Sequence, residues 1–180
     1  RGSTAGSGWP ANNAVDAGSF LGKLRARTGL TFDLPTEAQW EYACRAGTTT
    51  ALNSEKNLTA EEKCPNVAEV GRYKGNSGTS EADSDATVGS AKVGSYAPNQ
   101  WGLYDMHGNV WELCLDCWQD DLGSSDQTDP PGAASGGDKR VYRGGNWRTI
   151  ARTCRSAYRT WGPLSSRYNN LGFRLVKMVP

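Results

Sequence analysis

The chain is poor in histidine and has few cysteines. Its 180 residues include one histidine, His107, and five cysteines. A structural zinc ion needs four ligands, usually cysteine and histidine. Cys114 and Cys117 form a CxxC pair, but no second CxxC and no histidine pair completes the set, so we expect no zinc site. The cysteines are also too few for a disulfide-rich scaffold.

Long apolar runs are absent as well, and so are the common nucleotide-binding motifs. No stretch is apolar enough to span a membrane, and we find neither a phosphate-binding loop nor a dinucleotide fingerprint. We therefore expect no membrane span. The chain begins at Arg1 and not at methionine, which indicates a processed form or a piece of a longer protein.

The chain is rich in glycine and tryptophan. It contains 22 Gly, 8 Pro and 7 Trp, and 37% of its residues are hydrophobic. A chain of 180 residues can bury a sizeable core within one domain. The glycine and proline content predicts much ordered loop, with large aromatic side chains supplying the core. We expect Trp101, Trp111 and Trp118 in that core.

The charges are unevenly distributed. Residues 139–180 contain ten Lys and Arg but no Asp or Glu, whereas residues 1–138 contain ten bases and nineteen acids. One interpretation is a basic face for anionic ligands. We favour the other, in which these arginines pair with acidic residues inside the fold, because arginine suits partly buried ion pairs. The bases are spread through apolar and aromatic sequence, so no nucleic-acid binding is expected.

Two short helices are predicted near the start of the chain. Residues 16–28 have apolar side chains at helical spacing. Residues 34–47 give the clearest helix, because Thr36 and Gln39 form a capping box and Gly47 can close the last turn.

The remaining chain predicts strands and loops. The polar segment 48–98 should have little regular structure apart from a short strand at 92–96. Further strands are expected at 140–143 and 171–176. The predicted class is α+β, with a small antiparallel sheet and much ordered loop.

Five sequence blocks identify a family. In chain order they are LPTEAQWEYACRAG, NQWGLYDMHGNVWELCLDCW, RVYRGGNW, CRSAYR and NNLGFRLV, and they span Leu34 to Val176. Their order and spacing resemble the formylglycine-generating enzyme and sulfatase-modifying-factor family. The resemblance implies a variant of the C-type-lectin fold. We expect one such domain over residues 1–180, without the segment with which the family's domain usually begins.

The resemblance also implies a structural calcium ion. Asp105, Gly108, Val110 and Glu112 match one calcium site of the family, with carboxylate oxygens from Asp105 and Glu112 and backbone carbonyls from the other two. Calcium commonly combines these two kinds of oxygen ligand. The alternative is that both carboxylates pair with arginines of the C-terminal segment and bind no metal.

A second calcium site of the family would fall in the long polar segment. Its ligands would be Asn66, Val67, Asp85 and Thr87, although Asp83 could replace Asp85. An ion there would hold the long loop in place.

The paired cysteines of an active enzyme are not matched. The resemblance implies that active enzymes of this family oxidise a cysteine of the substrate with two cysteines of their own and copper. Those two cysteines follow shortly after a Gly-Gly turn. Here the segment NWRTIARTCRSAYR after that turn contains one cysteine, Cys154, so we expect no copper and no catalytic residue. We interpret Cys154 as a core residue, although Arg152 and Arg155 could lower its pKa. We expect His107 to be a turn residue, because its spacing supports no Cys-His or Ser-His catalytic arrangement.

The C-terminal segment resembles a ligand-binding surface. Non-catalytic relatives, including the variable proteins of diversity-generating retroelements, present such a surface on this fold. Here chemically mixed positions interrupt the family framework, and their aromatic residues suit a binding face or the packing of the C-terminal lobe equally. The predicted ligand-binding residues are Asn146, Arg148, Thr149, Ile150, Thr153, Tyr158, Thr160, Trp161, Leu164 and Tyr168.

The sequence therefore predicts a calcium-stabilised, non-catalytic domain that binds a protein or other surface ligand through residues 146–168. The alternative is an oxidase that acts on a cysteine of a sulfatase-type substrate. Direct sugar binding by calcium is not favoured, because the predicted ligands of the ion lie inside the segment 99–118.

Overall fold

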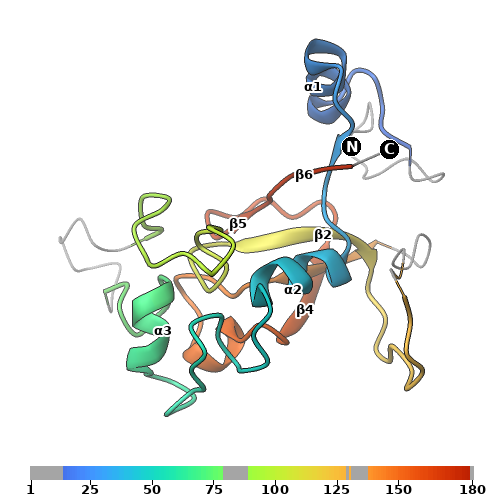
Figure 1. Cartoon of the computed structure of the whole chain (residues 1–180). Coiled ribbons are helices and arrows are strands. Elements are labelled where there is room, and N and C mark those ends of the chain that lie inside the picture. The colour runs from blue at the N-terminus through green and yellow to red at the C-terminus, as the bar shows by residue number, and fades with distance from the viewer. Residues whose placement is uncertain (1–13, 79–88, 129, 131–137, 179–180) are drawn as a thin grey trace.

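The computed structural model describes residues 14–78, 89–128, 130 and 138–178. Figure 1 shows a central sheet with one helix packed against it, a second at its side and a third held away from the body. The elements are α1 (Phe20–Thr28), β1 (Phe32–Asp33), α2 (Glu37–Arg45), α3 (Pro65–Val70), β2 (Trp111–Cys117), β3 (Lys139–Arg143), the 3-10 helix η1 (Ala151–Cys154), β4 (Arg159–Pro163), β5 (Leu171–Gly172) and β6 (Val176–Lys177). None of the described helices has the length and apolar character needed to cross a membrane.

The strands form two sheets. The larger has the order β4-β3-β2-β5, and the smaller pairs β1 with β6. The β2–β3 and β3–β4 pairs are antiparallel, whereas β5 runs parallel to β2. The predicted α+β class is confirmed, and the sheet is antiparallel apart from this one pair.

Helix α2 forms as its sequence predicts. The Thr36 hydroxyl accepts a hydrogen bond from the Gln39 N–H at 3.1 Å, and the Gln39 side chain accepts one from the Thr36 N–H at 3.0 Å. This reciprocal box satisfies N–H groups that a helix start would otherwise leave unpaired. The helix ends at Arg45, because its C-cap Ala46 has a φ of 47°, which already lies in the left-handed region one residue before Gly47.

Three predictions for other elements need correction. Residues 92–96 form a turn and not a strand, because Gly94 has a φ of 73° and the Ser95 hydroxyl donates to the Lys92 carbonyl. Helix α3 was not predicted. It begins at Pro65, and its residue Val67 is buried in the core. The predicted strand 171–176 is divided into β5 and β6.

The core consists of two buried clusters. One lies between α2 and the large sheet and comprises Trp40, Cys44, Met106, Cys114 and Val141, with Trp118 packed against it. The other joins α3 to η1 and comprises Leu52, Cys64, Val67, Val70, Tyr73, Ala151 and Cys154. Trp101 belongs to neither cluster. It is 48% exposed and packs edge-on against the exposed Tyr42, so its predicted burial is wrong.

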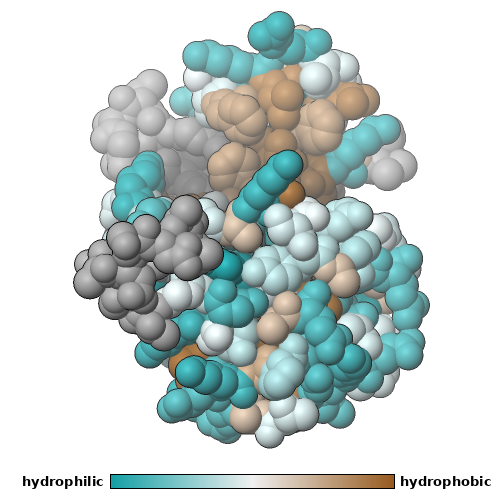
Figure 2. All heavy atoms as spheres, turned by 90° about the vertical axis from the view of Figure 1, so that its left-hand side faces the viewer, coloured by the Kyte–Doolittle hydropathy of each residue, from teal (hydrophilic) through white to brown (hydrophobic). Residues whose placement is uncertain are grey.

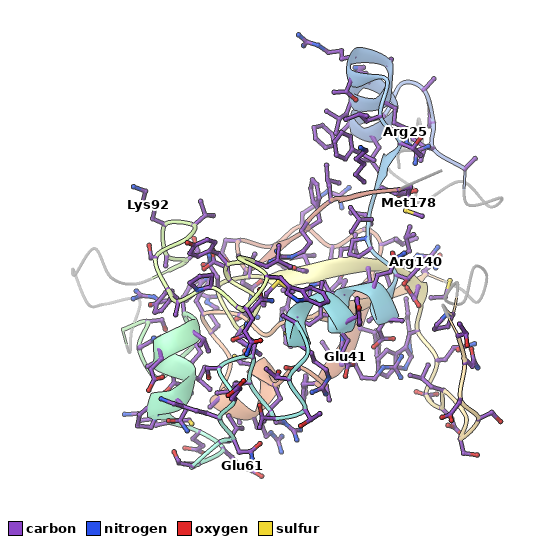
Figure 3. All side chains as sticks on the ribbon, in the orientation of Figure 1. Arg25, Glu41, Glu61, Lys92, Arg140 and Met178 are labelled. Carbon is purple, nitrogen blue, oxygen red and sulfur yellow. The ribbon has the colours of Figure 1, made fainter. Side chains whose placement is uncertain are left out.

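Helix α1 directly precedes β1 and is held beside the two-stranded sheet of β1 and β6. Arg25 anchors it, since its Nε donates to the Phe32 carbonyl at 2.7 Å and its Nη2 pairs with Asp33 at 3.0 Å. The Met178 N–H donates to the Thr31 carbonyl, and Figure 3 shows Arg25 and Met178 at this end of the molecule. Figure 2 shows apolar side chains gathered below α1.

Candidate functional site

The arginines of the C-terminal segment form ion pairs with helix α2. Glu37 binds Arg159 through both carboxylate oxygens, at 2.7 Å each. Arg143 is fully buried, pairs with Glu41, and places its Nε 3.7 Å from Glu37. Figure 3 shows Glu41 on α2 beneath the sheet. These contacts confirm our favoured interpretation of the charge distribution for Arg143 and Arg159, which neutralise acids within the fold.

The first predicted calcium site lies around a hollow beside β2. The hollow has a volume of about 540 Å³, and Asp105, Val110 and Glu112 line it together with Phe173 and Arg174. The described residues contain no group of three or more His, Cys, Asp or Glu side chains placed to hold a metal. The predicted ligand set does not require one, because it combines two carboxylates with backbone carbonyls.

Asp105 fits a cation, since one of its oxygens is buried without a partner. Its Oδ2 accepts a hydrogen bond from the Gly94 N–H at 2.8 Å, whereas Oδ1 is buried and accepts none. Asp105 also has a φ of 58°, and Gly108 in the same loop has a φ of 82°. A buried anionic oxygen without a donor is costly, and a bound cation would satisfy it.

Glu112 already has partners on both oxygens. Arg174 binds it in a bidentate pair at 2.5 and 2.7 Å, and the Trp40 indole N–H donates to the same carboxylate at 2.6 Å. The predicted metal ligand is thus also the partner of a C-terminal arginine, as the alternative interpretation expected for this carboxylate.

The second predicted calcium site is only partly described. Asn66 and Val67 lie in α3, where the Val67 carbonyl accepts a hydrogen bond from the Gly71 N–H at 2.9 Å. Asp85, Thr87 and the alternative ligand Asp83 lie outside the described residues. This site stays a prediction.

The cysteine beyond the Gly-Gly turn is in the core. Cys154 is fully buried, and burial raises the pKa of its thiol to about 12. The neighbouring Arg152 is exposed and pairs with Glu61 at 3.8 Å, so it does not provide the pKa-lowering contact considered from the sequence. A buried thiol with a raised pKa is a poor nucleophile at neutral pH.

His107 lies in a buried network that the sequence did not indicate. Its Nε2 accepts a hydrogen bond from the Asn53 N–H at 3.0 Å, and its Nδ1 lies 2.6 Å from the Cys154 carbonyl oxygen. The Cys44 sulfur lies 3.8 Å from Nε2, a contact that the spacing along the chain did not indicate. Because Cys44 and His107 are both fully buried, this contact holds chain segments together and offers no surface for a substrate.

The side of the large sheet that faces away from α2 carries a row of large side chains. Strand register pairs Leu113 with Tyr142 and Tyr142 with Thr160, which places these three side chains on one face. The Tyr158 ring stacks on Trp111, with ring centroids 6.1 Å apart. We call Trp111, Leu113, Tyr142, Tyr158 and Thr160 the aromatic face. All except Tyr142 are half-buried and therefore remain accessible.

The loop after β4 borders the aromatic face, since the Tyr142 hydroxyl donates to the carbonyl of Pro163, where that loop begins. It carries two further predicted ligand-binding residues, the half-buried Leu164 and Tyr168, which is 62% exposed. Trp161 lies on the other side of the sheet, in register with Val141, and its ring contacts the Lys139 ammonium group at 3.6 Å. The structure therefore divides the residues that were predicted to share one surface.

The predicted residues around η1 contribute unequally. Arg148 is exposed and packs its guanidinium over the Trp147 ring, and Thr149 and Ile150 are half-buried. Asn146 is 1% exposed, and its Oδ1 accepts a hydrogen bond from the Arg148 N–H. Thr153 is 8% exposed and bonds within its own turn. The last two side chains are therefore buried and do not form part of an accessible surface.

Sequence reasoning missed Trp111, Leu113 and Tyr142 as members of the aromatic face. Trp111 was predicted in the core, but it is only half-buried and belongs to neither buried cluster. Leu113 and Tyr142 lie outside residues 146–168, and only the strand register brings them beside Thr160. In Trp111–Cys117 the large apolar residues alternate with polar residues and cysteine, and this was the available signal for the β2 members, because alternate strand residues share a face.

Comparison with known proteins gives consistent matches. Residues 9–179 match the family model described as the sulfatase-modifying factor enzyme 1-like domain. The formylglycine-generating enzyme of Mus musculus is 36% identical over 144 residues, covering 78% of this chain and 38% of that protein. The inactive C-alpha-formylglycine-generating enzyme 2 of Mus musculus is 30% identical over 147 residues, covering 78% of this chain and 41% of that protein.

Among solved structures, the chain is similar to Treponema denticola variable protein 1. The TM-score is 0.66 and the sequence identity 37%, over 80% of this chain and 46% of that one. The chain therefore spans less than half the length of each of these three proteins.

Proposed function

The chain belongs to the sulfatase-modifying factor enzyme 1-like family and has the C-type-lectin-like α+β fold of that family, and from this premise we propose that it is a non-catalytic domain that binds a protein or other surface ligand. The aromatic face is the observation that carries the proposal. It combines accessible Trp and Tyr rings with the predicted binding residues Tyr158 and Thr160, and Tyr168 borders it. Aromatic side chains anchor interfaces because they bury much area at small entropic cost.

The state of the cysteines supports a non-catalytic role. The segment after Gly145 contains one cysteine, and burial raises the pKa of Cys154 to about 12. Copper(I) chemistry of the kind found in active relatives needs accessible thiolates. The similar mouse protein that is named inactive supports the same view, whereas the similar active enzyme supports the alternative oxidase.

The similarity to a variable protein supports a more specific form of the proposal. Residues 146–168 would then be the part of the chain that differs between natural copies, on a constant framework. Sequencing natural copies tests this directly. Differences confined to the surface residues of that segment support diversified ligand binding, and differences spread evenly over the chain contradict it.

A peptide selection tests the binding surface. A random peptide library displayed on phage would be panned on the wild-type chain, and selected clones would then be tested on two variants. Thr160→Arg places a charge within the aromatic face, whereas Tyr42→Ala alters an exposed side chain on α2 and serves as the matched control. We expect clones to lose binding to Thr160→Arg and to keep it on Tyr42→Ala. Clones that bind all three proteins equally contradict the proposal.

An activity assay tests the alternative. The purified chain would be incubated with copper and a peptide that contains a sulfatase-type cysteine motif, and aldehyde would be measured. We expect none, because Cys154 is buried and lacks a second cysteine at the family spacing. Aldehyde formation that disappears in Cys154→Ser would establish the oxidase and overturn the non-catalytic proposal.

We also propose a structural calcium ion at Asp105, Gly108, Val110 and Glu112, and a second at Asn66, Val67, Asp85 and Thr87. The buried and unpartnered Asp105 Oδ1 supports the first site. An ion that binds only the folded chain stabilises it by mass action. Chelation should therefore lower the melting temperature by several degrees, and Asp105→Asn should reduce that difference. An unchanged melting temperature counts against both sites.

A further inference from the structure

We propose that Arg174 is a built-in cation of the first calcium site: its guanidinium shares Glu112 with the ion, holds the site together when no ion is bound and limits its affinity for calcium. The proposal rests on the calcium site proposed above. It concerns a residue outside the predicted ligand set, contributed by the chain after β5.

Arg174 meets Glu112 in a geometry that uses the whole carboxylate. Its Nη2 donates to Oε1 at 2.7 Å and its Nε to Oε2 at 2.5 Å, while the Trp40 indole N–H also donates to Oε2. The Glu112 side chain is 8% exposed and the Arg174 side chain 23%, so solvent screens this pair weakly. The Arg174 Nη2 also donates to the Tyr104 carbonyl at 3.1 Å, which fixes the guanidinium in place.

Asp105 and Arg174 act on each other across the same hollow. Both residues line it, and Arg174 is the only Lys or Arg among the described residues that do so. A guanidinium does not lose its proton in proteins. Arg174 therefore supplies a positive charge beside Glu112, in the hollow that Asp105 also lines, when no metal is present.

Calcium and Arg174 would then compete for one carboxylate. An ion that binds Asp105 Oδ1 and Glu112 lies near the guanidinium, and like charges in a poorly screened hollow repel strongly. Calcium binding must also release Glu112 at least partly from a bidentate pair. Replacing the guanidinium by a neutral group removes both costs to the ion, but it leaves Glu112 without its ion-pair partner in the metal-free chain.

Calcium titration of the full chain tests the proposal. Calcium chloride would be titrated calorimetrically into chelator-treated wild type, Arg174→Gln and Arg174→Lys. We expect Arg174→Gln to bind calcium at least about tenfold more tightly than wild type, because a unit charge beside a ligand carboxylate is removed. Arg174→Lys keeps the charge but loses the bidentate pair, so its affinity should lie between the two.

Two further variants separate this effect from nonspecific ones. Asp105→Asn should weaken binding in every background. Arg152→Gln removes an arginine whose contact with Glu61 is exposed, so calcium affinity should stay at the wild-type value. Melting temperatures give an independent readout: Arg174→Gln should melt below wild type in chelator and should gain more from calcium than wild type does.

The possible results distinguish the two proposals. Calcium binding by wild type with no tighter binding by Arg174→Gln overturns the role of Arg174 and leaves the calcium site standing. No calcium binding by either protein overturns both. If Arg174→Gln does not fold in chelator, folding of this variant on addition of calcium supports the proposal. The comparison of the calcium affinities of Arg174→Lys and wild type then decides it. A lysine variant that binds no more tightly than wild type would then contradict the competition.

Discussion

At the scale of single residues, His107 is the clearest case of a side chain whose protonation is set by burial. The Asn53 N–H donates to Nε2, so the imidazole proton resides on Nδ1 and is donated to the Cys154 carbonyl. Burial lowers the pKa of His107 to about 4. Because the chain has one histidine, its NMR signals need no assignment among several. We expect the imidazole shifts to stay constant from pH 8 to about pH 5, whereas a midpoint near its ordinary pKa would contradict the buried network.

The same shift makes stability depend on pH. The unfolded chain protonates His107 below its ordinary pKa of about 6.5, while the folded chain does not until the pH approaches 4. The contribution of His107 to the free energy of unfolding is therefore fully present above that ordinary pKa and is lost as the pH falls toward 4. Integrated over this window, the loss contributed by His107 is about 3 kcal/mol. Urea unfolding at a series of pH values measures it, and a stability that is flat across the window argues against it.

Asp116 should act in the opposite direction. Burial raises its pKa to about 6, with the Glu37 charge adding to the effect and the hydrogen bond from the Glu37 N–H opposing it. Its folded pKa lies above its unfolded value, so its contribution is present at low pH and is lost as the pH rises from about 4 to 6. Asp116→Asn keeps an acceptor for the Glu37 N–H and cannot ionise. The variant should gain stability relative to wild type by about 2 kcal/mol between pH 4 and pH 8, measured by urea unfolding. A gain that is equal at both pH values contradicts the assignment.

At the scale of elements, the capping box of α2 gives a local prediction. Thr36→Ala removes the hydroxyl that accepts the Gln39 N–H and leaves that donor unpaired at the buried start of the helix. We expect a loss of about 1 kcal/mol in the free energy of unfolding. Thr28→Ala is the matched control, because its hydroxyl donates to the Leu24 carbonyl and accepts from the Leu30 N–H at the exposed end of α1, where water can replace the hydroxyl. Equal losses in the two variants would mean that the box contributes nothing special.

The elements differ in how far their sequences reveal them. Helix α2 is predictable because its box, its apolar side and its termination lie within a few residues of one another. Strand β2 is not, because its polar side chains face inward. Glu112 and Asp116 are buried against Trp40 and the Glu37 N–H, whereas Leu113 lies on the more accessible face. A rule that turns polar residues outward assigns this strand the wrong way round, and only partners far away in the sequence correct it.

The candidate sites show the same division. The turn that presents Asp105 and Gly108 was predictable from a local motif. The pairing of Glu112 with Arg174 joins residues that are 62 positions apart, and no spacing rule points to it. The aromatic face likewise depends on register between β2, β3 and β4. Sequence therefore indicated which segments contain the candidate sites, and packing decided which side chains of those segments share a surface.

At the scale of the whole molecule, the last strands close both sheets. β5 pairs with β2, β6 pairs with β1, and Arg174 between them supplies the charge partner of Glu112. The C-terminal segment thus connects α1 to the body, as Figure 1 shows at the upper end of the sheet. Residues at the end of the chain complete structure that begins near its start, so the fold should be cooperative over its full length.

Removal of residues 171–180 tests this cooperativity. It deletes β5, β6 and Arg174 and keeps the complete aromatic face with Tyr168. Glu112 would stay buried with only the Trp40 N–H as its described partner, and breaking such a pair costs about 3 kcal/mol or more. The loss of two strand pairings adds to that cost, and the total is a large share of the roughly 5 to 15 kcal/mol that stabilises a domain. We expect the shortened chain to lack a cooperative thermal transition by circular dichroism, whereas a chain that lacks only residues 179–180 keeps both strands and should melt like the wild type. A cooperative transition within a few degrees of wild type in the shortened chain would show that the body folds without its closing strands.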